Sequence, residues 1–419
     1  VHGAAREYYV ATDGDDNNPG TQASPFRTIN KACSQLLDRH DGLPVGGVTV
    51  WIRDGVYRET VRPRRSGRPD APVRFVACPG ENPVISGADI LDVPWTVHSG
   101  KIYKASTTVV FEQLFVDGQM MQEARWPNTP IRDLIRARHA TCDDGTNEAI
   151  LVDDALPQGD WNDAYVHIRA YPGWDYRTKR IADYSAGKSI ELSEVGWADF
   201  RRKTMPGDHY WLFGSLAGLD RATEWFLDDE SQLVYLWCPG DPDPACHMLE
   251  VKQREYAFDL SGRDHIGIEG LRMFAAGVSM DNSTHCTVAG CHLKCPVHRR
   301  IVPASVYWSD RFWTSNYMSG SYNEWKDTVI AHSSGQGIHD MGYSNRVTNC
   351  IIHDWAYAGN GSGAIQATSG ASYGQYANNT VYEGAGDGVK MYTASYLRIE
   401  RNDISRVGTL LSDDQACIW

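Results

Sequence analysis

Residues 346–352 read Arg-Val-Thr-Asn-Cys-Ile-Ile, and this short pattern recurs through the second half of the chain. Its copies align without internal gaps on one column, which consists of Gly270, Gly290, Asp327, Asn349, Asn378 and Arg401. Successive members are 20, 37, 22, 29 and 23 residues apart. The spacing indicates a repeat of about 22 residues that carries loop insertions in some copies, as in stacked repeat proteins.

This repeat predicts a parallel β-helix. Each copy has room for two or three short strands, has Gly or Asn where a corner is needed, and shows little helical periodicity. Successive coils of such a fold stack about 4.8 Å apart, so that like residues form ladders. Leucine-rich repeats have a similar period, but their leucine-dense signature is absent, and a propeller blade needs nearer 40 residues.

Two further columns predict how the coil interior is filled. Small or amide side chains follow the first column and suit an inward corner where Asn bonds the backbone along the stack: Leu271, Cys291, Thr328, Cys350, Asn379 and Asn402. An apolar column two positions later predicts a core ladder: Met273, Leu293, Ile330, Ile352, Val381 and Ile404. Cys291 and Cys350 are therefore interpreted as small buried residues and not as zinc ligands.

The N-terminal end of such a stack must be covered, because an open end exposes unpaired strand edge. Residues 24–37 predict a capping helix with Ser24 as N-cap, Pro25 at its first position, and Ile29, Cys33 and Leu36 on one face. The acidic stretch 13–21 before it departs from the calcium-binding EF-hand pattern and is interpreted as a turn. No cofactor is expected to be required, and a structural calcium ion stays open as an alternative.

The coil pattern is lost between about residues 108 and 250, which indicates an inserted β-rich subdomain. We expect three segments: 1–107 with the cap and first coils, 108–252 as the insertion, and 253–419 with the coils that carry the active-site face. Seven of the 14 Trp lie between Trp126 and Trp237, where they either line a glycan platform or simply pack a core. A second insertion, 296–323, supplies Trp308, Arg311 and Trp313 as candidate substrate-binding residues.

Composition narrows the class of protein. The chain has 419 residues, 42% of them hydrophobic, and a net charge of −13, which repels nucleic acid. No apolar run approaches the roughly 20 residues of a membrane span. The start at Val1, without Met or an apolar signal segment, fits either a mature secreted protein or a shortened chain. We expect a secreted or periplasmic protein. Among the ten cysteines, Cys238 and Cys246 form a candidate local disulfide bridge.

Several stretches resemble a known class of enzymes. Tyr8-Tyr-Val-Ala-Thr-Asp-Gly and Ser24-Pro-Phe-Arg-Thr-Ile are similar to the N-terminal segment of right-handed parallel β-helix carbohydrate-active enzymes. Phe115-Val-Asp-Gly and Ala124-Arg-Trp-Pro-Asn, with the late coils, resemble β-helical glycoside hydrolases of the α-L-fucosidase and xylanase kind (glycoside hydrolase family 141-like). The resemblance implies an all-β fold with an inserted subdomain and a carbohydrate substrate. Polysaccharide lyases share the N-terminal segment.

The candidate catalytic residues lie in the last coils. The stretch Gly386-Asp-Gly-Val-Lys-Met aligns with similar stretches of the preceding coils. In this alignment Gln336, Ser362 and Asp387 share one column, and His339 and Lys390 share another. On the next coil, Asp414 or Asp413 lands beside Asp387. Carboxyl groups on neighbouring coils can reach the roughly 5 to 9 Å used by glycosidase pairs. The competing interpretation is an aspartate ladder at solvent-facing corners, with or without a bound cation.

Lys390 separates two enzyme classes. In a hydrolase it orients or neutralises a carboxylate, whereas in a lyase it abstracts the proton next to a uronate carboxylate. His339 and Glu383 are further candidate substrate contacts, and no metal ligand is assigned. The resembling enzymes have Gly-Ala-Ile-Tyr where this chain has Ala416-Cys-Ile-Trp, and we expect the natural protein to continue beyond Trp419. A glycan-binding β-helix without activity is the third alternative.

Overall fold

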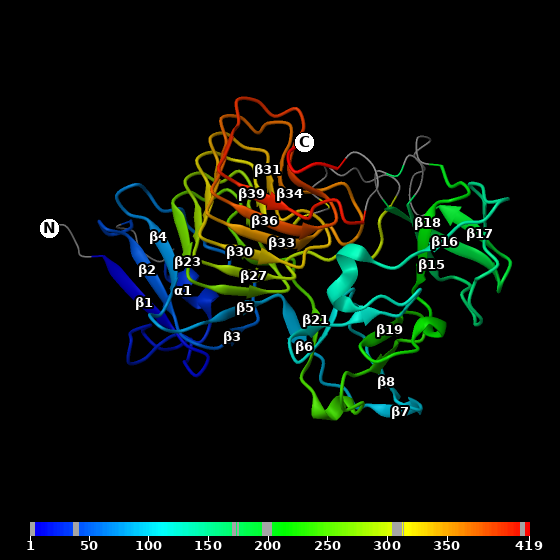
Figure 1. Cartoon of the computed structure of the whole chain (residues 1–419). Coiled ribbons are helices and arrows are strands. Elements are labelled where there is room, and N and C mark those ends of the chain that lie inside the picture. The colour runs from blue at the N-terminus through cyan, green and yellow to red at the C-terminus, as the bar shows by residue number, and fades with distance from the viewer. Residues whose placement is uncertain are drawn as a thin grey trace.

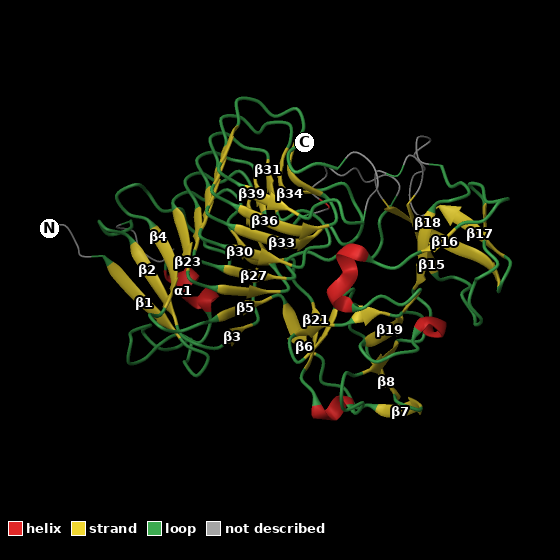
Figure 2. Ribbon diagram, viewed as in Figure 1, coloured by secondary structure: helices red, strands yellow, loops and turns green. Residues whose placement is uncertain are grey.

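The computed structural model describes residues 5–36, 42–169, 173, 176–194, 203–303, 312, 314–410 and 415–419. Its main body is a right-handed parallel β-helix (Figures 1 and 2), which confirms the predicted fold class. Three parallel sheets, here named A, B and C in the order in which each coil visits them, form its faces.

The strands of each sheet follow one another along the helix axis. Sheet A contains β1 (Arg6–Val10), β2 (Val48–Ile52), β4 (Val73–Ala77), β23 (Ile266–Glu269), β26 (Thr287–Ala289), β29 (Glu324–Lys326), β32 (Arg346–Thr348), β35 (Gln375–Ala377) and β38 (Arg398–Glu400). Sheet B contains β3 (Val56–Tyr57), β5 (Val84–Ser86), β24 (Arg272–Phe274), β27 (His292–Lys294), β30 (Val329–Ala331), β33 (Ile351–Trp355), β36 (Thr380–Gly384) and β39 (Asp403–Ser405). Sheet C contains β22 (Tyr256–Asp259), β25 (Gly277–Met280), β28 (Tyr317–Met318), β31 (Ile338–Asp340), β34 (Gly363–Ala367) and β37 (Asp387–Met391).

The corner between sheets A and B is the column from which the repeat was recognised. All its members, from Gly270 to Arg401, have φ between 52° and 71°, a left-handed conformation that Gly and Asn adopt at least cost. The next column points inward, as predicted. The Asn379 Oδ1 atom accepts a hydrogen bond from the Cys350 N–H at 2.9 Å, and the Asn402 Oδ1 atom accepts one from the Asn379 N–H at 2.9 Å.

The apolar column forms the predicted core ladder in sheet B. Strand register aligns Met273 with Leu293, Leu293 with Ile330, Ile330 with Ile352, and Ile352 with Val381. These side chains are buried. Cys291 and Cys350 are buried free thiols in the coil interior, which confirms their interpretation as small core residues, and all ten cysteines are free. The predicted Cys238–Cys246 bridge is therefore wrong: the first thiol is buried and the second exposed.

The N-terminal cap is shorter than predicted. Helix α1 spans Ile29–Gln35, with Ile29, Ala32 and Cys33 buried, and its N-cap is Thr28 instead of Ser24. The reason is that Phe26 is extended and bridges Val10 of β1. The Asp16 carboxylate accepts hydrogen bonds from the N–H groups of Arg27 and Thr28, both at 2.9 Å, so the acidic stretch fixes the chain before the helix.

Between β5 and β22 the chain leaves the coil stack and forms smaller, mostly antiparallel sheets. This segment, from β6 to β21, is called the insertion, or the excursion from the coils. One contains β6 (Ala88–Ile90), β9 (Leu114–Val116), β10 (Gln119–Met120) and β21 (Leu249–Lys252). A second contains β7 (Thr96–Ser99), β8 (Ile102–Ser106), β11 (Gln122–Glu123), β19 (Glu224–Asp228) and β20 (Leu233–Trp237). The third contains β12 (Arg125–Trp126), β13 (Ala140–Thr141), β14 (Ile150–Val152), β15 (Tyr165–Arg169), β16 (Tyr176–Ser185), β17 (Ser189–Glu194) and β18 (His209–Phe213), and short 3-10 turns lie at Ile131–Arg136 (η1), Leu216–Gly218 (η2) and Pro244–Cys246 (η3).

The coils on either side of this excursion are direct neighbours, because β4 pairs in parallel with β23, with Phe75 opposite Ile268. In Figure 1 the sheets of the excursion lie beside one side of the coil stack. Trp161 and Trp225 are fully buried there, so these two rings pack cores and do not line a glycan platform. Within the described part of the chain, no helix has the length and apolarity to cross a membrane.

Candidate active site on sheet C

A row of polar side chains runs along the outer face of sheet C. Strand register aligns His339 with Gln366 and Gln366 with Lys390. The prediction that His339 and Lys390 share a column is confirmed. Because side chains alternate along a strand, this row lies opposite the inward Ile338, Ile365 and Val389.

Asp387 is the first residue of β37 and is fully buried. Its Oδ2 atom accepts a hydrogen bond from the Lys390 Nζ atom at 2.8 Å, and its Oδ1 atom accepts one from the Ala416 N–H at 2.8 Å. The Lys390 amine also donates to the Gly361 carbonyl at 2.7 Å and lies 4.8 Å from the centre of the Trp419 ring. The structure thus places an ion pair, with side-chain exposures of 0% and 6%, at the start of a sheet C strand.

The glycines on either side of Asp387 allow the neighbouring coils to approach. A Cβ atom on Gly388 would lie 2.4 Å from the Cys417 carbonyl oxygen, and one on Gly386 would lie 2.1 Å from that of Ser362. The predicted column is off by one residue at its middle member, because Gly363, and not Ser362, pairs with Asp387. Ser362 instead accepts the Asp387 N–H through its carbonyl at 3.1 Å.

His339 and Asp340 are both buried on β31, on opposite faces of sheet C. The His339 Nε2 atom bonds the Thr368 hydroxyl at 2.7 Å, and its ring meets that of Tyr317 edge-on. The Asp340 carboxylate points into the coil and accepts hydrogen bonds from the Tyr376 hydroxyl at 2.8 Å and from the Asn345 amide at 2.8 Å. Burial raises the pKa of Asp340, and these contacts give it a structural role.

Glu383 lies on a different face from Asp387. Glu383 lies on β36 of sheet B, two residues after the inward Val381, and its own φ is 58°. It forms ion pairs with Arg136 of the insertion and with Arg406. Desolvation raises the pKa of Glu383, but the two guanidinium groups outweigh it and leave the pKa lowered. Asp413, Asp414, Trp308, Arg311 and Trp313, the other candidate site residues, lie outside the described residues.

A cluster of charges that the sequence did not reveal joins the insertion to the coils. The Arg300 guanidinium pairs with the Glu123 carboxylate at 2.7 Å, and the Arg299 guanidinium pairs with that of Glu255 at 2.8 Å. Burial lowers the pKa of the nearby Lys252 to about 8. Lys252, Glu255 and Arg299 line a cavity of about 230 Å³. Partners such as Arg300 and Glu123 are far apart in the sequence, so no motif or period pointed to them.

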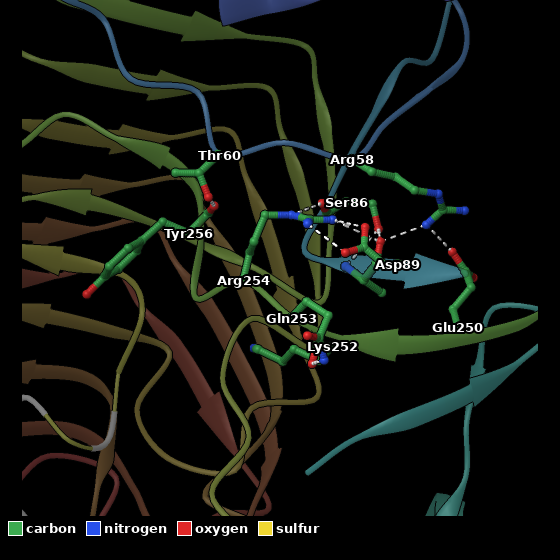
Figure 3. Close-up of polar contacts among 10 residues, drawn as sticks. Arg58, Thr60, Ser86, Asp89, Glu250, Lys252, Gln253, Arg254 and Tyr256 are labelled. Atoms are coloured by element: carbon green, nitrogen blue, oxygen red, sulfur yellow. Dashed lines mark hydrogen bonds and ion pairs between the residues drawn. The ribbon is translucent and has the colours of Figure 1, made fainter. Parts of the chain in front are cut away.

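A second set of contacts fixes the two strands by which the chain leaves and rejoins the coils (Figure 3). The Arg58 guanidinium contacts both the Ala88 carbonyl at 2.7 Å and the Glu250 carboxylate at 2.6 Å. The Arg254 Nη1 atom donates to the Asp89 carboxylate at 2.9 Å. These pairs hold β6 and β21 against the first coils.

Comparisons with known proteins agree with this architecture. The family model of the right-handed β-helix region matches residues 312–417. The uncharacterised protein YwoF of Bacillus subtilis (strain 168) is 34% identical over 93 residues, which cover 22% of this chain and 18% of that protein. The pectate lyase PEL9 of Emericella nidulans is 30% identical over 92 residues, which cover 22% of this chain and 20% of that protein.

The two matches thus span about a fifth of the length of each relative. A solved structure described as a glycoside hydrolase superposes with a TM-score of 0.57 at 15% identity, and the alignment covers 95% of this chain and 96% of that one. This likeness extends over the coils and the insertion together and shows the fold.

Proposed function

We propose that this protein is a glycoside hydrolase that cleaves a plant or microbial polysaccharide, with Asp387 as one of two catalytic carboxyl groups. The observation that carries the proposal is the ion pair of Asp387 and Lys390 on sheet C. Burying a charge is costly, and groups buried in this way concentrate at functional sites. The resemblance of the N-terminal segment and late coils to β-helical glycoside hydrolases supports the same reaction.

In this mechanism Asp387 acts as acid, base or nucleophile. Lys390 and the Ala416 N–H hold its two oxygens in place, so the carboxyl group is fixed in one orientation at the start of β37. We propose Asp414, or its neighbour Asp413, as the second carboxyl group. Carboxyl groups about 5 Å apart give retention of anomeric configuration, and groups about 6.5 to 9.5 Å apart give inversion.

A polysaccharide lyase is the second candidate, and the relative named pectate lyase PEL9 favours it. Lys390 would then abstract the proton next to a uronate carboxylate. The Lys390 amine, however, donates to Asp387 and to the Gly361 carbonyl. A base must direct a free lone pair at its substrate, so this arrangement suits an orienting role for Lys390 and favours the hydrolase.

The proposal also covers the substrate contacts around Asp387, the location of the protein and its need for cofactors. His339 lies in the same row as Lys390 and is proposed to help order the substrate side of sheet C, while Trp308, Arg311 and Trp313 are proposed to bind the glycan. We further propose that the protein acts outside the cytoplasm, secreted or periplasmic, on a carbohydrate and not on nucleic acid or membrane, and that it needs no cofactor for the reaction.

The test incubates the protein with neutral and uronate glycans while reducing ends and ultraviolet absorbance are read together. A hydrolase releases reducing ends without new absorbance, whereas a lyase also creates an absorbing unsaturated uronate. Asp387→Asn should lower turnover by about two to four orders of magnitude, the usual contribution of a general acid or base. Asp340→Asn is the matched control, because it alters another buried sheet C carboxylate that points into the coil. Full activity in Asp387→Asn would contradict the assignment.

A further inference from the structure

A groove that lies away from the proposed active site runs between the outer face of sheet B and the insertion. Its volume is about 580 Å³. Its floor is formed by residues of β3, β5, β24, β27, β30 and β33, which are consecutive neighbours in sheet B, and its other wall by Gly118, Met248 and Glu250 of the insertion. At about 4.8 Å per strand, the groove extends roughly 24 Å along the helix axis. This elongated shape suits a linear chain better than a small metabolite.

The floor of the groove combines apolar surface with cations. Phe274 and Val329 contribute apolar area, and Met248 at the opposite wall is 47% exposed. Arg272 and Lys294 are exposed on the neighbouring strands β24 and β27. The Lys294 amine donates only to the Gly118 carbonyl, at 3.2 Å, and the Arg272 guanidinium bonds no described residue. Both cations are therefore available to a ligand.

Few acids oppose these cations. Glu250 is the acidic residue in the groove lining, and the Arg58 guanidinium already pairs with it at 2.6 Å. The ion pairs of Arg58 with Glu250 and of Arg254 with Asp89, shown in Figure 3, also fix the insertion at this end of the groove. Arg58, Arg272 and Lys294 thus outnumber Glu250 among the residues that line the groove. The Asp354 carboxylate lies next to the lining, 2.6 Å from the His353 Nδ1 atom. The lining residues are therefore positive on a chain whose total charge is −13.

We propose that this groove binds an acidic polysaccharide, specifically a linear chain of uronate sugars, as a second glycan site separate from the Asp387 site. Uronate carboxylates match Arg272 and Lys294, since guanidinium groups form bidentate bonds with carboxylates. The C–H faces of the sugars match the apolar and imidazole surface beside them, which includes His292 and His353. A peptide is a poorer match, because the strands β5 to β33 pair on both sides and leave no free edge for strand addition.

The test measures binding by titration calorimetry with an oligogalacturonate and with the same oligosaccharide as its neutral methyl ester. Chromatography of the ligand at the end of each titration confirms that it is intact, so that the result does not depend on turnover. The acid form should bind and the ester should bind much more weakly. Arg272→Glu should weaken binding of the acid form by about tenfold or more, the loss expected when a hydrogen bond to a charged group is replaced by repulsion.

Arg346→Glu is the matched control, because it makes the same change of charge at an exposed position on sheet A. Equal binding by Arg272→Glu and Arg346→Glu, equal binding of acid and ester, or no binding of the acid form by the wild-type protein would overturn the proposal. Equal competition by inorganic phosphate or polyglutamate would overturn the assignment to glycan. Failure of the hydrolase proposal would instead appear as wild-type turnover in Asp387→Asn, with groove binding unaffected.

Discussion

The ion pair between Asp387 and Lys390 makes a quantitative prediction that separates a structural role from a chemical one. Both side chains are almost fully buried, with exposures of 0% and 6%, and their charged atoms are 2.8 Å apart. Removing one partner leaves the other charge buried without compensation, at a cost of about 3–5 kcal/mol. We therefore expect Asp387→Asn and Lys390→Met each to lower the free energy of unfolding by about that amount.

The double variant should be much less damaged than the sum of the two. With the ammonium gone, the amide that replaces the Asp387 carboxylate can keep the bond to the Ala416 N–H. The hydrogen bonds that Lys390 made to Asp387 and to the Gly361 carbonyl are lost, and each group left unpaired costs about 1–3 kcal/mol. The coupling energy from the cycle should accordingly reach several kcal/mol. Urea unfolding of the four proteins, followed by tryptophan fluorescence, measures it. Strictly additive losses would refute the idea that each charge compensates the other.

Activity in the same four proteins then assigns the role of Asp387. If this carboxylate performs chemistry, the double variant regains stability but stays inactive, because an amide can neither transfer a proton nor attack the sugar. If Asp387 serves the fold alone, glycan cleavage should return together with stability. Activity in the stable double variant would therefore refute the catalytic assignment even where the single variant is inactive for lack of folded protein.

Two other parts of the structure give further predictions. Asn379→Ala should destabilise the fold by about 2–4 kcal/mol, because it leaves the buried Cys350 N–H and Val347 carbonyl without their bonds; Asn378→Gly, at the left-handed corner beside it, should change the urea midpoint little, and equal effects would contradict the ladder. Burial lowers the pKa of His167, between the insertion and the coils, to about 3. In the unfolded chain the His167 side chain binds a proton near pH 6.5, whereas in the folded protein it stays neutral until about pH 3. The stability that neutral His167 contributes is therefore present above pH 6.5 and is lost as the pH falls towards 3. The urea midpoint should drop over this range in the wild type and less steeply in His167→Gln, whereas parallel pH profiles would contradict it.

The sequence by itself determined the architecture of the coils, because each copy of the repeat must meet the same local structural requirements. Every coil needs a left-handed residue at one corner, a small or amide side chain after it, and an apolar residue two positions later. Aligning the copies therefore exposed the corner, the Asn379 ladder and the core column. It also placed His339 and Lys390 in one row, since strand register follows from the same alignment.

The alignment of the repeats gave wrong positions where loops interrupt the period. A loop inserted in the coil before Gly363 moved the column that contains Asp387 by one residue at this position. No repeated neighbour fixes the register inside such a loop. The capping helix starts at Thr28 because Phe26 pairs with β1, a contact that local helix signals do not contain.

Only the tertiary structure decided what surrounds the coils. Arg300 meets Glu123 across 177 positions of sequence, and Arg58 meets Glu250 across 192; neither pair leaves a periodic or local trace. The burial of Asp387 and the positive groove on sheet B likewise arise where segments distant in sequence pack together. Composition reports the total charge of −13, but the position of each charge on the surface is set by the fold.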